Sequence, residues 1–164
     1  MKNIKNVRSY RNMIHVLFVC HGNICRSTMS QFVMQYLVEA QQLQDQFYID
    51  SAATSREEIG NDVHYGTKAK LREMNIPFTH HAARQMTKKD YTDFDYLIGM
   101  DEANLRNMQR ISGGDPQHKI YSLLSFAGRR DSIADPWYTG NFDATFQDVW
   151  EGCNALLETL KKEL

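Results

Sequence analysis

The segment IHVLFVCHGNICRS, residues 14–27, decides the fold of this chain. Its first six residues form an apolar run rich in β-branched and aromatic side chains, which is typical of a strand covered on both faces of a parallel sheet. A turn follows at residues 20–23, and the apolar positions from Met29 to Ala40 repeat with helical spacing. The segment therefore predicts a strand, a tight loop and an amphipathic helix, in that order.

The same alternation of strands and helices continues to the C-terminus. The further elements that the pattern predicts are a strand at 47–53, a helix at 62–74, a strand at 96–100, a helix opened by Asp101, a strand at 119–124 and a terminal helix with an apolar stripe from Phe146 to Leu160. Alternation of this kind predicts an α/β fold, with a central four-stranded parallel sheet and helices on both faces. We expect a doubly wound, flavodoxin-like arrangement, in which ligands bind beyond the carboxyl ends of the strands.

The length of 164 residues favours a single domain. Residues 1–13 are polar and basic without an apolar period, so we expect a flexible N-terminal extension before a domain that spans 14–164. The lysine- and arginine-containing start carries no apolar stretch like that of a signal peptide, and no run approaches the roughly 20 apolar residues of a membrane span. The sequence predicts a cytoplasmic protein.

Charge and composition exclude several classes of function. A formal net charge of -1 provides no broad basic surface, so we expect neither nucleic acid nor a membrane as a partner. Three cysteines are too few for a disulfide framework. The six histidines lack the spacing of metal ligands, so no metal and no other cofactor is expected. Nothing in the sequence calls for self-association, and we expect a monomer.

The loop after the first strand carries the candidate chemistry. Successive loop amides and a helix N-terminus form a concave anion site, because their unpaired donors and the positive end of the helix dipole point the same way. Gly22 and Asn23 tolerate the backbone conformations that let such a loop curl. Arg26 adds a planar fork that can hold two phosphoryl oxygens at once. The sequence predicts a phosphate-binding loop made of His21, Gly22, Asn23, Ile24, Cys25 and Arg26.

A thiol at Cys20 would lie in the centre of this positive cradle and is expected to ionise readily. Ionisation alone adds little rate, because the gain in thiolate is nearly offset by its lower nucleophilicity. The larger contribution must come from donors fixed around the transferring phosphoryl group and from in-line placement of the sulfur. Ser27, directly after Arg26, is predicted to donate a hydrogen bond to the thiolate.

The stretch VLFVCHGNICRS resembles the signature of the low-molecular-weight protein tyrosine phosphatases. The similarity continues in order through DSAATS, EIGN, ARQ, FDYLIGMD and ADPWYTGNFD, and covers the chain from about Ile14 onward. It implies hydrolysis of phosphotyrosine and small aryl phosphates through a cysteinyl-phosphate intermediate, with tyrosine-phosphorylated proteins as substrates and inorganic phosphate as product. By this resemblance Cys20 is the nucleophile, Arg26 binds the phosphoryl group and Asp135 is the general acid.

The resemblance also implies polar supporting residues and a substrate rim. The supporting residues are Asn23, Ser27, Ser51 and His81, and the rim residues are Glu57, Trp137 and Tyr138. Glu57 stands where the family usually has an aromatic residue, and its carboxylate is expected to disfavour acidic peptides. Thr28 stands where the family commonly has proline, which removes a preset backbone angle but none of the amide donors, so we expect activity to survive.

Several alternatives remain open from the sequence. An arsenate reductase on the same scaffold would need a relay of downstream cysteines, and only Cys153 follows the loop, on the apolar stripe of the terminal helix. A module that binds phosphotyrosine without hydrolysing it is a second alternative. Cys25 could form a reversible disulfide with Cys20 or could serve packing alone. The polar cluster at 88–90 is expected to be a solvated face.

Overall fold

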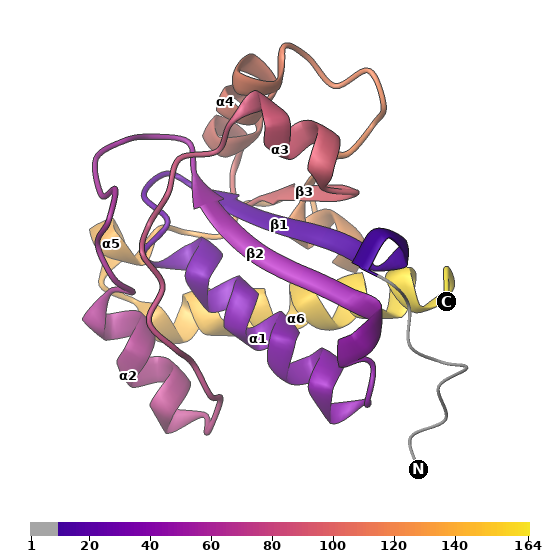
Figure 1. The fold of residues 1–164 in the computed structure, drawn as a ribbon. Coiled ribbons are helices and arrows are strands. Elements are labelled where there is room, and N and C mark those ends of the chain that lie inside the picture. Colours follow the sequence, from indigo (N-terminus) through magenta and orange to yellow (C-terminus); the bar gives the residue numbers. More distant parts are fainter. Residues whose placement is uncertain (1–9) are drawn as a thin grey trace.

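The computed structural model describes residues 10–164, and its centre is a parallel sheet of four strands in the order β2-β1-β3-β4 (Figure 1). The strands are β1 (Ile14–Cys20), β2 (Phe47–Ala53), β3 (Tyr96–Gly99) and β4 (Ile120–Ser122). The predicted four-stranded parallel sheet is confirmed. Residues 1–9 of the predicted extension lie outside the described residues, and Tyr10–Asn12 form a short 3₁₀ turn (η2).

Strand β1 is the middle of the structure. All seven of its residues are buried, His15 included, as a run that is apolar at nearly every position predicts. It pairs in parallel with β2 from Ile14 opposite Phe47, and with β3 from Val16 opposite Tyr96. Its carboxyl end at Cys20 therefore opens beside the ends of both neighbouring strands, which is where ligands bind in sheets of this kind.

Helices cover both faces of the sheet, as predicted. On one face, α1 (Arg26–Ala40) and α6 (Phe142–Lys161) pack with Val16 and Phe18 of β1 in one apolar core. On the other face, a second core joins Leu17 and Val19 to α3 (Lys88–Asp93) and α4 (Glu102–Ser112). Figure 1 shows these two layers on opposite sides of β1. The remaining helices are α2 (Tyr65–Glu73), α5 (Pro136–Thr139), η3 (Gln44–Gln46) and η4 (Leu123–Ala127).

Three element boundaries differ by two residues or more from the sequence-based expectation. Helix α1 begins at Arg26, three residues before the first apolar position of its pattern, because the polar first turn faces the site and is buried there. Helix α2 begins only at Tyr65, since His64 is extended and its side chain caps the helix. Strand β4 ends at Ser122, and the apolar residues after it form the 3₁₀ turn η4.

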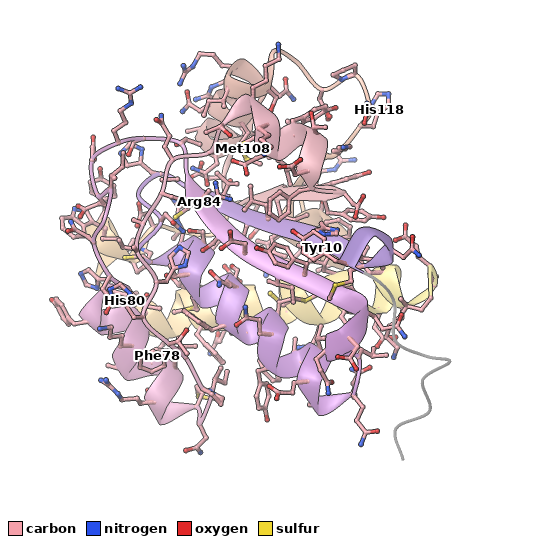
Figure 2. All side chains as sticks on the ribbon, in the orientation of Figure 1. Tyr10, Phe78, His80, Arg84, Met108 and His118 are labelled. Carbon is pink, nitrogen blue, oxygen red and sulfur yellow. The ribbon has the colours of Figure 1, made fainter. Side chains whose placement is uncertain are left out.

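The expectation of a solvated face at residues 88–90 holds for Lys88 and Lys89, which are exposed, and is wrong for Asp90. Asp90 is 6% exposed and forms a capping box with Thr87 at the start of α3. Its carboxylate also accepts two hydrogen bonds from Arg84, at 3.0 and 3.1 Å, and Arg84 lies over β2 (Figure 2). The polar sequence of this short helix is therefore stabilised by its cap and by an ion pair that joins it to the preceding loop.

Gly152 provides a test of the packing between α6 and η4. A Cβ atom at this position would lie 2.6 Å from Cγ of Leu123, a fully buried side chain. Alanine improves helix propensity by up to about 1 kcal/mol, but overpacking of a core costs about 1–3 kcal/mol. We expect Gly152→Ala to lower the free energy of unfolding in urea by about 1–2 kcal/mol. A variant as stable as the wild type would contradict the close approach of these two elements.

Candidate active site

The loop between β1 and α1 curls as the sequence predicts, and Asn23 carries the strained conformation. Asn23 has φ 59°, in the left-handed region that asparagine tolerates better than most residues. Gly22 is not at positive φ; its missing side chain instead permits a close approach, because a Cβ there would lie 3.3 Å from Cγ of Glu58. Glycine and asparagine thus serve the loop in different ways, and only the second supplies the left-handed turn.

The loop carbonyls point into the protein. Those of Cys20 and His21 accept from the amides of Thr54 and Ser55, and that of Ile24 accepts from the amide of His64, at 2.9 to 3.1 Å. Among residues 10–164, no acceptor pairs with the amides of residues 22–25. Because the C=O of one residue and the N–H of the next point in opposite directions, the carbonyls of Cys20, His21 and Ile24 that bind the surrounding chain turn the amides of residues 21, 22 and 25 toward the concave side of the loop.

Cys20 lies at the base of this cradle and is 3% exposed. Its sulfur is 3.1 Å from Oγ of Ser27, and that oxygen accepts a hydrogen bond from Nδ2 of Asn23 at 2.9 Å. Because the Asn23 amide occupies an acceptor position of the hydroxyl, the O–H of Ser27 is free to donate to a thiolate. Ser27 is therefore within hydrogen-bond distance of the sulfur, and its role as a donor to the thiolate stays a prediction.

The predicted supporting residues come together behind the loop. Asn23 donates to Ser51 at 2.9 Å, and its Oδ1 lies 2.9 Å from Nε2 of His81. Burial lowers the pKa of His81, so a neutral ring completes this network at pH 7. The sequence reasoning missed Gln31, whose Oε1 accepts from Ser51 at 2.5 Å. These bonds hold the one left-handed residue of the loop from several sides.

Arg26 is 2% exposed and is held by three acceptors. Its Nη1 donates to Oδ2 of Asp101 at 2.6 Å and to the carbonyl of Ile133 at 3.0 Å, and its Nη2 lies 3.4 Å from Oδ2 of Asp135. Burial alone would lower the pKa of Arg26, but Cys20 and the two carboxylates raise it above its ordinary value. The guanidinium is therefore a fixed cation beside the loop.

Asp135 joins this group from the far end of the chain. It caps α5, because its Oδ1 accepts from the amide of Trp137 at 3.0 Å while Oδ2 faces Arg26. Asp135 and Cys20 line one pocket together with the loop residues that precede Asn23 and follow it. The structure thus brings Cys20 and Asp135 to one cavity, and the buried Arg26 reaches this group through its contact with Asp135.

The predicted rim residues line the same pocket. Trp137 and Tyr138 are 57% and 82% exposed and form an aromatic wall beside Asp135. Glu57 lines it as well, and its Oε2 is 2.9 Å from Nε2 of His21. The neighbouring Glu58 also lines the pocket and was not singled out from the sequence. Two aromatic rings and two carboxylates therefore line the entrance to the cradle.

Comparison with known proteins decides the family. The model of the low molecular weight phosphotyrosine protein phosphatase family matches residues 15–164. The chain belongs to this family. The phosphatase YfkJ of Bacillus subtilis is 39% identical over 92% of this chain and 98% of its own length. Its crystal structure superposes with a TM-score of 0.89, covering 92% of this chain and 96% of that one.

Two further relatives show the breadth of the family. The human low molecular weight phosphotyrosine protein phosphatase is 40% identical, covering 87% of this chain and 93% of its own. A Drosophila arginine phosphatase of known structure is 30% identical in sequence. The two structures superpose with a TM-score of 0.80, covering 89% of this chain and 97% of that one. This chain is a protein tyrosine phosphatase by family, as the resemblance of its loop indicates.

The other cysteines of the phosphatase differ from Cys20 in their surroundings. Burial, followed by the charges of Cys20 and Asp135, raises the pKa of Cys25 to about 12, so Cys25 stays a thiol at neutral pH. Cys153 is fully buried, and burial raises its pKa as well. All three cysteines are free. Cys25 packs with Ile24 and Ala83, which is the packing role that the sequence left open beside a disulfide with Cys20.

A relay of cysteines is not available to the described part of the phosphatase. Cys153 is the only thiol downstream of the loop, and its sulfur contacts the carbonyl of Ser30 within the core. The arsenate reductase alternative therefore lacks the resolving thiol that it requires. Within residues 10–164, no three histidine, cysteine, aspartate or glutamate side chains gather into a metal-binding group. None of the helices there has the length and apolar character needed to span a bilayer.

Asp101 is the most important site residue that the sequence reasoning missed. One carboxylate oxygen caps α4, accepting from the amide of Asn104 at 2.8 Å, and the other holds Arg26. The sequence indicated only that Asp101 begins a helix. Its contact with Arg26 was not visible there, because the two residues are 75 positions apart. The signal that could have found it is its place directly after β3, at the carboxyl edge of the sheet.

Replacing Asp101 with asparagine separates these two roles. Asparagine retains the oxygen that caps α4 but turns an N–H₂ group toward the guanidinium of Arg26. Because a small displacement of a positioning group can cost up to about 100-fold, we expect Asp101→Asn to lower kcat/KM for an aryl phosphate by about 10- to 100-fold. Thermal unfolding should change little. Glu102→Gln, one residue along and exposed, is the matched control; equal activity of the two variants would contradict the role.

Proposed function

We propose that Cys20, Arg26 and Asp135 carry out the hydrolysis of phosphotyrosine in proteins, within a catalytic domain that spans residues 14–164. The observation that carries this proposal is that Cys20 and Asp135 line one pocket, that the buried Arg26 contacts Asp135 at 3.4 Å, and that the amides of residues 22–25 have no acceptor within residues 10–164. The substrate's phosphoryl group lies in the cradle, and its three terminal oxygens accept from the amides and from Arg26.

In the first step the thiolate of Cys20 attacks phosphorus in line with the ester oxygen. The bond between phosphorus and the phenolic oxygen breaks, and Asp135 gives its proton to the leaving phenolate, whose conjugate acid has a pKa near 10. The products of this step are free tyrosine hydroxyl and a cysteinyl phosphate. Ser27 stabilises the sulfur by donating to it as it regains charge in the second step.

In the second step Asp135, now a carboxylate, takes a proton from water. That water attacks phosphorus, the bond between sulfur and phosphorus breaks, and inorganic phosphate leaves. The charge of Arg26 and the amide dipoles of the loop keep their positions in both steps, so little reorganisation accompanies the reaction. We further propose that Asn23, Ser51 and His81 act by holding the loop in this shape, and that the protein works as a cytoplasmic monomer.

Hydrolysis of para-nitrophenyl phosphate in the presence of EDTA tests the proposal. We expect turnover without metal, an initial burst of nitrophenol equal to the enzyme concentration if the second step is slower, and a phosphorylated Cys20 in acid-quenched samples by mass spectrometry. Binding of phosphate without turnover would instead indicate a binding module. Faster hydrolysis of phosphoarginine peptides than of matched phosphotyrosine peptides would move the substrate to the class named for the Drosophila relative.

A further inference from the structure

A second cavity adjoins the catalytic pocket and plays no part in the reaction. It lies between the start of α2 and α5, which are neighbours in Figure 1, and its volume is about 520 Å³. The catalytic pocket and this groove share the side chains of Ile24, Glu58 and Trp137. A polypeptide with its phosphotyrosine in the pocket would therefore lie next to the groove, which is continuous with the proposed catalytic site.

Aromatic rings line the groove in a fixed arrangement. The ring of His64 stacks between those of Tyr65, at 4.3 Å, and Phe142, at 5.4 Å, and meets the edge of Trp137 at 5.6 Å. Tyr65 and Trp137 are 80% and 57% exposed. Large aromatic side chains that are rigidly stacked and yet open to solvent are typical of a surface that contacts a partner.

The charges around the groove are negative. The carboxylate of Glu58 is bonded at 2.6 Å to the neutral amide of Asn61, so its charge is not compensated there. Asp62 is paired with Lys68, and Glu57 with His21. Arg56 of the same loop is held by Gln85 at 3.0 Å and does not line the groove.

His64 adds no positive charge to this wall at neutral pH. Its Nδ1 accepts a hydrogen bond from the amide of Gly66 at 3.0 Å, which requires that nitrogen to be unprotonated. Burial also lowers the pKa of His64. The groove therefore presents ring faces and one free carboxylate, which together favour a cation with a flat or apolar body.

We propose that the groove binds an arginine or lysine side chain of the substrate, close in sequence to the phosphotyrosine, with Glu58 pairing its charge and Tyr65 and Trp137 contacting its stem. Arginine fits better than lysine, because its planar guanidinium both stacks on rings and pairs with a carboxylate. This specificity rests on the proposed function, since it concerns which phosphotyrosine is hydrolysed. It would make the enzyme select phosphotyrosines in basic sequence surroundings.

Matched phosphotyrosine peptides test the proposal on the full chain. Each peptide carries arginine, alanine, leucine or aspartate at one position near the phosphotyrosine, and the positions on both sides are varied one at a time. We measure kcat/KM for each peptide at low and high salt. We expect arginine to exceed alanine by about 5- to 20-fold at the preferred position, aspartate to fall below alanine, and the preference to shrink at high salt. Equal values for all peptides, or a preference for leucine that salt does not change, would overturn it.

Variants assign the preference to the groove. In Glu58→Gln the ratio of kcat/KM between arginine and alanine peptides should fall to near one, and in Tyr65→Leu it should fall in part. Glu73→Gln, at the other end of α2, removes a carboxylate away from the groove and should keep the wild-type ratio. Because each ratio is internal to one variant, a loss of folded enzyme does not affect it.

An unchanged ratio in Glu58→Gln would contradict the proposal. Hydrolysis of para-nitrophenyl phosphate by the wild type separates the two levels of the account. If that small substrate is not hydrolysed, the proposed function fails; if it is hydrolysed and the peptides do not differ, only the groove's role fails.

Discussion

Cys20→Ser should abolish hydrolysis of para-nitrophenyl phosphate, with a loss of kcat on the order of 10⁴- to 10⁶-fold, comparable to removal of the nucleophile in other covalent enzymes. The serine hydroxyl occupies nearly the same space but stays protonated at neutral pH. The amides of residues 22–25 and Arg26 are unaffected, so the phosphate-binding cradle should persist.

Calorimetric titration with inorganic phosphate completes this test. We expect Cys20→Ser to bind phosphate with an affinity within a few-fold of the wild type or tighter, because the repulsion between thiolate and anion is removed. Cys25→Ser is the matched control, because it replaces a second cysteine of the same loop whose thiol stays protonated at neutral pH. If Cys25→Ser lost turnover as completely as Cys20→Ser, the assignment of the nucleophile would be wrong.

Asp135→Asn should slow the hydrolysis of phenyl phosphates by about 10²- to 10⁴-fold, the usual contribution of a positioned general acid. Asparagine keeps the oxygen that caps α5 through the amide of Trp137, so the helix and the aromatic wall should stay in place. The change removes the proton donor, and it also places Nδ2 where Oδ2 now faces Arg26. Asp135→Ala removes the capping oxygen as well, so comparison of the two variants shows how much of the loss depends on the cap.

A series of aryl phosphates with leaving groups of different pKa gives the decisive measurement for Asp135. The loss in Asp135→Asn should grow with the pKa of the leaving phenol, because a good leaving group needs no proton in the transition state. A loss that is the same for every leaving group would instead indicate that Asp135 acts on phosphate binding through Arg26, 3.4 Å away.

Local pattern was sufficient to predict the sheet and the curled loop between β1 and α1. The apolar run of β1 and the helical spacing after Met29 each arise from burial of one continuous segment, so neighbouring residues alone reveal them. The left-handed conformation of Asn23 could also be predicted locally, because asparagine tolerates positive φ better than most residues do. The supporting roles of Ser51 and His81 came from family resemblance, and the structure brings both to Asn23.

The contacts of Arg26 could not be predicted in the same way. Its acceptors Asp101 and Asp135 are 75 and 109 residues away, and only the packing of α4 and α5 against the carboxyl edge of the sheet brings them to one guanidinium. Helix α3 was missed for another reason. Its sequence has no apolar period, and the capping box with Asp90 stabilises it instead.

The central claim is that main-chain amides and one guanidinium hold a tetrahedral oxyanion directly against the sulfur of Cys20. A crystal structure with bound vanadate tests it most directly. The account predicts vanadium bonded to that sulfur, its oxygens accepting from the amides of residues 22–25 and from Arg26, with Asp135 facing the apical oxygen. An anion bound elsewhere, or a sulfur turned out of the cradle, would contradict the account.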